Sequence, residues 1–89
     1  METVQVLRGF AIVVCDRGFV YVGDIDYTDQ FCIIKKAYNI RYWGTERGLG
    51  ELALEGNKEK TKLDKVGTVR VPSRAIINII DTEVKLWKF

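Results

Sequence analysis

The first half of the chain consists of short apolar runs, rich in β-branched and aromatic residues, separated by polar turns. Such runs are typical of β-strands. They predict three strands, over Phe10–Cys15, Phe19–Ile25 and Phe31–Ala37. Asp and Gly residues, which favour turns, fall between the runs at 16–18 and 26–30. The first two strands are therefore expected to form a hairpin, and the third can continue toward Trp43.

A change in hydrophobic period marks the middle of the chain. Leu49, Leu52 and Ala53 stand at positions i, i+3 and i+4, which predicts an amphipathic helix of about two turns. Gly56 and Asn57 suit the C-terminal cap of this helix. The segment Gly44–Gly48 is then a loop between the third strand and the helix.

The last third alternates between charged and apolar segments. The lysine-rich stretch 58–65 is predicted to be a solvated loop. Strands are expected over Gly67–Val71 and within Arg74–Asp81, where the run AIINII indicates burial on both faces. The tail Glu83–Phe89 is expected to add a final strand.

These elements predict a mainly β protein with about five or six short strands and one helix. The expected architecture is a single domain over 1–89, folded as a small, strongly bent antiparallel β-barrel or roll, SH3-like or Sm-like. Because a chain of 89 residues buries a limited core, we expect a homo-oligomer.

The residue composition excludes several kinds of catalytic and metal-binding site. The chain contains no histidine, which excludes Ser-His and Cys-His catalysis and histidine-ligated metals within it. Cys15 and Cys32 stand in apolar runs, and we expect two buried thiols, with a disulfide between neighbouring strands as the alternative. We expect no cofactor, no metal and no enzymatic activity. The alternative is a metal-dependent phosphodiesterase that uses Asp24 and Asp26, which share one face of a strand.

The net charge of +2 is too small for a typical duplex-binding domain, but basic residues cluster locally. Between residues 35 and 50, four cations face one acid, and aromatic rings and glycines lie among them. Cations pair with phosphate, aromatic faces stack on bases, and glycines let a backbone approach a ligand. The candidate ligand-binding residues are Lys36, Arg41, Tyr42, Trp43, Gly44, Thr45, Arg47 and Gly48. The alternative is that the rings pack, the glycines turn the chain and the charges are solvated.

The segment IRYWGTERGLGELALEG resembles a family of small uncharacterised proteins from tailed phages and prophages. The matching positions are Ala37, Ile40, Trp43, Gly44, Leu49, Glu51, Leu52, Ala53 and Gly56. The chain departs from the family where relatives carry two arginines after the alanine, since it has Tyr38 and Asn39 there. The resemblance implies a viral protein in the cytoplasm of an infected bacterial host. It implies no specific activity.

Small phage proteins without a catalytic set often counter host defence. We therefore expect an oligomeric protein that sequesters a nucleotide-derived immune second messenger, such as a cyclic dinucleotide or an ADP-ribose derivative, without cleaving it. The alternative is an inhibitor that binds a host protein directly through Trp43, Tyr42 and Phe89. Binding of single-stranded nucleic acid is a further alternative, and no membrane association is expected, since no apolar run approaches the ~20 residues of a transmembrane span.

Overall fold

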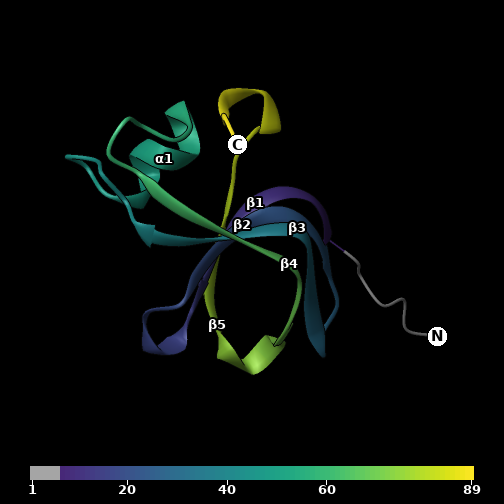
Figure 1. The fold of residues 1–89 in the computed structure, drawn as a ribbon. Helices are drawn as coiled ribbons and strands as arrows, with labels where there is room; N and C mark the ends of the chain where they lie inside the picture. Colours follow the sequence, from purple (N-terminus) through teal and green to yellow (C-terminus); the bar gives the residue numbers. More distant parts are fainter. Residues whose placement is uncertain (1–6) are drawn as a thin grey trace.

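The computed structural model describes residues 7–89, which form one strongly curved antiparallel sheet and one helix (Figure 1). In chain order the elements are β1 (Leu7–Cys15), β2 (Val20–Tyr27), β3 (Phe31–Tyr42), α1 (Leu49–Glu55), β4 (Lys62–Pro72) and β5 (Ile76–Asp81). The strand order across the sheet is β4-β3-β2-β1-β5. The predicted mainly β class, the first three strands and the helix are confirmed.

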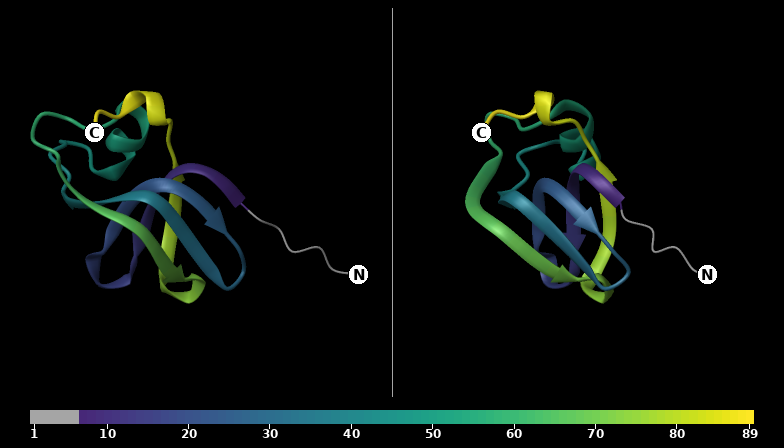
Figure 2. Two further views of the ribbon diagram at one scale, coloured as in Figure 1. Left: turned by 45° about the vertical axis from the view of Figure 1, so that its right-hand side comes forward. Right: turned by 90° about the vertical axis from the view of Figure 1, so that its right-hand side faces the viewer.

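The two edges of the sheet are β4 and β5, and they do not pair with each other within the described residues. A 3-10 turn, Ser73–Ala75, joins them. The Ser73 backbone N–H donates to the Gln30 carbonyl over 2.9 Å, and the Ser73 hydroxyl donates to the Thr28 carbonyl over 2.9 Å. These bonds hold the turn against the β2–β3 connection. The sheet curves strongly but stays open (Figure 2), so closure into an SH3-like or Sm-like barrel is not confirmed.

Both faces of β1, an inner strand of the sheet, are buried, each in a separate core. Ala11 and Val13 belong to the sheet core, whose buried members are Ala11, Val13, Cys15, Ile25, Cys32, Ile34, Ala37 and Val71. Ile12 belongs to the helix core, which lies under α1 and comprises Ile12, Val20, Val22, Ile40, Leu52, Ala53 and Trp87. The continuous apolar run in β1 therefore reflects its two covered faces.

The prediction that AIINII is buried on both faces is wrong. After Ala75, which ends the 3-10 turn, this run lies in β5, an edge strand whose residues are half-buried or exposed, and Ile77 is 65% exposed. Ile79 packs on the sheet core and Ile80 on the helix core. The strand lies against β1 on one side only, which is why a run as apolar as β1 stays largely open to solvent.

A β-bulge in β3 switches its side chains from one core to the other. On a regular strand, residues an even number of positions apart point to the same face. Ile34 nevertheless packs in the sheet core, and Ile40, six residues later, packs in the helix core. The register shifts between Ile34 and Ala37, and Lys36 takes a left-handed backbone conformation at φ 51°. Gly23 lies opposite, where a Cβ atom would come within 2.8 Å of Ile34 Cγ2. The bulge therefore lets one strand serve both cores and projects Lys36 from the sheet.

The predicted loop over 58–65 is wrong in its second half, because β4 begins at Lys62. Residues 62–65 pair with the second half of β3, with Leu63 opposite Ile40 and Lys65 opposite Tyr38. Leu63 packs on the helix core, while the lysines around it remain exposed. Lysines are common on edge strands because they discourage pairing with other chains, so the charged composition concealed a strand.

The predicted final strand is also wrong, since the tail folds as a 3-10 turn, Val84–Leu86, against α1. The Thr82 hydroxyl donates to the Ala53 carbonyl over 2.6 Å and accepts the Trp87 indole N–H over 3.0 Å. At the predicted helix cap, the Gly56 N–H donates to the Leu52 carbonyl over 2.8 Å. The tail lies so close that a Cβ atom on Gly56 would come within 1.9 Å of the Leu86 carbonyl oxygen.

Leu52 and Leu54 provide a test of the helix core. Leu52 is fully buried, whereas Leu54 is 77% exposed on the same helix. We expect Leu52→Ala to lower the free energy of unfolding by about 2–5 kcal/mol, because it leaves a cavity between α1 and the sheet. Leu54→Ala should stay within about 0.5 kcal/mol of the parent protein. Urea denaturation measures both, and equal effects would contradict the assigned packing.

Cys15 and Cys32 are free and buried in the sheet core, as the sequence predicts. Burial raises the pKa of Cys32 to about 11, with smaller contributions from Cys15 and Asp26, and burial followed by Asp16 raises the pKa of Cys15. We therefore expect both thiols to react slowly with a thiol-specific disulfide reagent at about pH 8 and rapidly in denaturant, because the thiolate is the reactive form. Rapid labelling of the native protein would contradict this packing.

Candidate functional site

The predicted site residues lie mainly at the end of β3 and in the loop before α1. Five of them line a solvent-open hollow of about 260 Å³: Arg41, Tyr42, Trp43, Gly44 and Thr45. Tyr42 is 59% exposed and Trp43 is 42% exposed. We name this hollow the loop hollow. The structure therefore brings most of the predicted set together, with two aromatic rings facing solvent.

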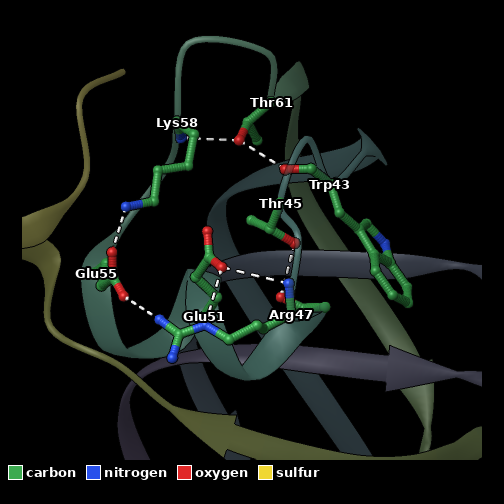
Figure 3. Close-up of polar contacts among 8 residues, drawn as sticks. Trp43, Thr45, Arg47, Glu51, Glu55, Lys58 and Thr61 are labelled. Carbon is green, nitrogen blue, oxygen red and sulfur yellow. Dashed lines mark hydrogen bonds and ion pairs between the residues drawn. The ribbon is translucent and has the colours of Figure 1, made fainter.

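Both arginines of this region are paired with carboxylates. Arg41 Nε lies 2.9 Å from Asp64 Oδ2 on β4. Arg47 lies beside α1, with Nε 3.4 Å from Glu51 Oε1 and Nη2 2.9 Å from Glu55 Oε2 (Figure 3). Exposed pairs of this kind are weak, but each carboxylate offsets a positive charge that a phosphate would otherwise meet.

Glycines and hydroxyls of the loop have structural partners. Gly44 adopts φ 67°, and a Cβ atom there would lie 2.4 Å from the Lys60 carbonyl carbon. The Thr45 hydroxyl donates to the Gly48 carbonyl over 2.9 Å, and the Thr61 hydroxyl donates to the Trp43 carbonyl over 2.7 Å. Gly48 precedes the helix at φ 79°. Close backbone packing at Gly44, the positive φ of both glycines and the hydrogen bonds of the two hydroxyls thus account for these residue types without a ligand.

On the helix side of Tyr42, a second hollow of about 530 Å³ adjoins the first. Its charged lining consists of Glu46, Glu51, Glu59, Lys58 and Lys60. Three carboxylates against two ammonium groups leave this surface net negative. Figure 3 shows the indole of Trp43 pointing away from the α1 carboxylates of Glu51 and Glu55. The helix side of the loop is therefore unfavourable for a multiply charged anion.

Lys36 lies apart from the other predicted residues, in a different hollow of about 360 Å³. We name it the aromatic hollow; its lining is Phe10, Asp24, Lys36, Tyr38, Lys65, Val84 and Phe89. The sequence does not indicate this grouping, because the remaining members come from four strands and the tail. The one available signal was the spacing of Lys36 and Tyr38 on one strand, which did not identify their cross-strand neighbours.

The candidate carboxylate pair does not form a joint site. Asp26 Oδ1 lies 2.9 Å from Arg8 Nε and its Oδ2 lies 3.4 Å from Lys35 Nζ, whereas Asp24 lines the aromatic hollow. Over residues 7–89, no group of three or more Asp, Glu, Cys or His side chains could hold a metal ion. The surroundings of Asp26 therefore favour an ion-pair role.

No protein-family model, curated protein sequence or solved structure matches the chain. The resemblance to phage proteins consequently stays a prediction. Within the described part of the chain, α1 and the short turns are the only helical elements, and none has the length and apolarity to cross a membrane.

The Glu55 carboxylate provides a test of the loop's electrostatics. A hydrogen bond from Lys58, followed by the Lys58 and Arg47 charges, lowers the pKa of Glu55 below its ordinary value of 4.5. Its contribution to stability is thus present above that value and is lost as the pH falls through the lowered pKa. We expect Lys58→Met to raise the pKa of Glu55 and Lys60→Met to leave it unchanged, as measured by NMR titration of the side-chain carboxyl. An unchanged pKa in Lys58→Met would contradict the pairing.

Proposed function

We propose that the protein binds and sequesters a nucleotide-derived second messenger without cleaving it. The supporting observation is that solvent-open hollows lined by aromatic rings and cationic side chains lie at the loop and at the tail. Aromatic faces stack on bases, and cations pair with phosphates. As the resemblance implies a phage protein, the proposed role is to withdraw an immune signal from the host cytoplasm.

Binding without turnover agrees with how the reactive groups are engaged. The lone serine, Ser73, donates its hydroxyl to a backbone carbonyl. The two thiols are buried in the sheet core with raised pKa values, and Asp26 lies between two cations. These groups hold the fold together, whereas a nucleophile or general base must reach its substrate.

A homo-oligomer remains part of the proposal. Large apolar side chains are exposed at several places, including Phe19 at 54%, Phe31 at 48% and Ile77 at 65%. Self-association would remove such surface from water, and a ligand at or near the subunit interface would then be enclosed more fully than one chain allows.

Direct binding to a host protein is the second candidate function. Tyr42 and Trp43 are adjacent in sequence and exposed, and Phe89 is 55% exposed. Tyr and Trp are the residue types that most often anchor protein interfaces. If the protein acts by binding a host protein, Trp43→Ala should abolish its effect on host defence in cells without changing its affinity for nucleotides.

Calorimetry with AMP, ADP-ribose and cyclic di-AMP, followed by mass spectrometry of the recovered ligand, tests the proposed function. We expect saturable binding of at least one of these nucleotides and its recovery unchanged in mass. Absence of binding across the panel would refute sequestration of this ligand class. Recovery of a cleaved product would instead identify an enzyme.

A further inference from the structure

We infer that the ligand site is the aromatic hollow, and that it takes a nucleotide unit consisting of one planar base and one phosphate group. This inference rests on the proposed function and assigns its site and ligand. It moves the site from the loop before α1 to the face of the sheet beside the C-terminal tail.

The floor of the aromatic hollow is a row of residues across four neighbouring strands. Phe10 on β1 pairs with Asp24 on β2, which pairs with Lys35 on β3 beside the bulge. Tyr38 on β3 pairs with Lys65 on β4. Residues paired in this way have Cβ atoms about 5 Å apart, which brings Phe10 beside Asp24 and Tyr38 beside Lys65 in the lining of one hollow. The bulge adds Lys36 to it by projecting this side chain from the sheet.

The tail supplies an aromatic wall. The rings of Tyr38 and Phe89 stack, with centroids 4.3 Å apart and an interplanar angle of 10°. The Asn57 side chain fixes the neighbouring backbone, since its Nδ2 donates to the Lys88 carbonyl and its Oδ1 accepts the Lys88 N–H, both over 2.7 Å. Phe89 remains 55% exposed, so an aromatic surface held in place by hydrogen bonds is still open to a planar ligand.

The aromatic hollow differs from the loop hollow in whether its cationic side chains form ion pairs. In the described part of the chain, neither Lys36 nor Lys65 forms an ion pair, whereas Arg41 and Arg47 both do. A phosphate therefore meets two ammonium groups that no described carboxylate holds in an ion pair, and with the Asp24 carboxylate the lining keeps one net positive charge. The Asp24 carboxylate gives the same surface two hydrogen-bond acceptor oxygens, which suit the amino group of a base such as adenine.

Size limits the ligand. The hollow measures about 360 Å³, which lies near the lower end of the range of small-molecule sites, ~300–1,000 Å³. One nucleotide unit is the corresponding ligand, either free or as one half of a cyclic dinucleotide. The two sources differ in stoichiometry, since a free nucleotide fills one site and a cyclic dinucleotide can join two chains.

The two tryptophans report on the two hollows separately by NMR. The Trp87 ring lies 5.9 Å from Phe89, and Trp43 lines the loop hollow. We expect AMP to shift the Trp87 indole N–H signal and leave the Trp43 signal in place, with Trp43→Phe assigning the two peaks. Adenosine and inorganic phosphate, added separately, should bind more weakly than AMP. Cyclic di-AMP should saturate at one ligand per two chains.

Matched variants then place the site by affinity. Lys36→Asn, which tolerates the left-handed backbone, and Lys65→Gln should each weaken AMP binding about tenfold. Phe89→Leu should weaken it similarly by removing the ring. Lys60→Gln and Trp43→Leu, the charge and ring controls in the loop region, should leave the affinity unchanged. Thermal unfolding of every variant separates lost binding from lost folding.

The outcomes distinguish the inference from the proposed function. In one outcome, AMP and the other probes bind, with binding abolished by the variants in the loop region but not by those in the aromatic hollow. In that case the assignment of the site to the aromatic hollow is wrong, and the proposed sequestration stands. If the wild-type protein binds no probe, the proposed function fails and this inference fails with it. Equal loss in both sets of variants, with unchanged stability, would also overturn the assignment to one hollow.

Discussion

Burial of both faces of β1 is the constraint on which the rest of the structure depends. Ala11, Ile12 and Val13 follow one another along the strand, and each is at most 1% exposed. Since side chains alternate between faces, such a run needs a cover on each side. Curvature of the sheet provides one cover, and α1 with the tail provides the other. Without either, several large apolar side chains would face water, at a cost of about 1.5–3 kcal/mol each.

The second cover also forms the candidate site. Hydrogen bonds hold the tail in place: the Thr82 hydroxyl donates to the Ala53 carbonyl of α1 and accepts the Trp87 indole N–H, and Asn57, just after α1, donates to the Lys88 carbonyl. Trp87 is buried in the helix core, and Phe89, two residues later, lies on Tyr38 at the sheet surface. The packing that protects β1 therefore also positions an aromatic wall beside two lysines. The tail therefore serves both stability and the proposed binding, so core variants are poor tests of function, and variants of the exposed Lys36 and Lys65 are better ones.

The loop before α1 shows how a sequence cluster can mislead about charge. Arg41, Arg47 and the aromatic residues are close in sequence, and the chain does bring most of this set together. However, the carboxylates that pair with the arginines come from Asp64 on β4 and from α1. Local counting of charges includes Glu46 but leaves these partners out. A charge that is paired across the fold attracts an anion less than its place in the sequence suggests.

The sequence by itself determined the β class, the first three strands, the two-turn helix with its glycine cap, and the burial of both cysteines. These features depend on local periodicity and turn chemistry, which a linear pattern contains. Only the tertiary structure decided that β1, and not the equally apolar β5, is covered on both faces, since composition carries no strand order. It also decided that a lysine-rich stretch pairs as β4, and that Lys36, Lys65 and Phe89 share one surface. Those placements follow from a bulge, from cross-strand register and from a tail that packs on α1, all of which join residues far apart in the chain.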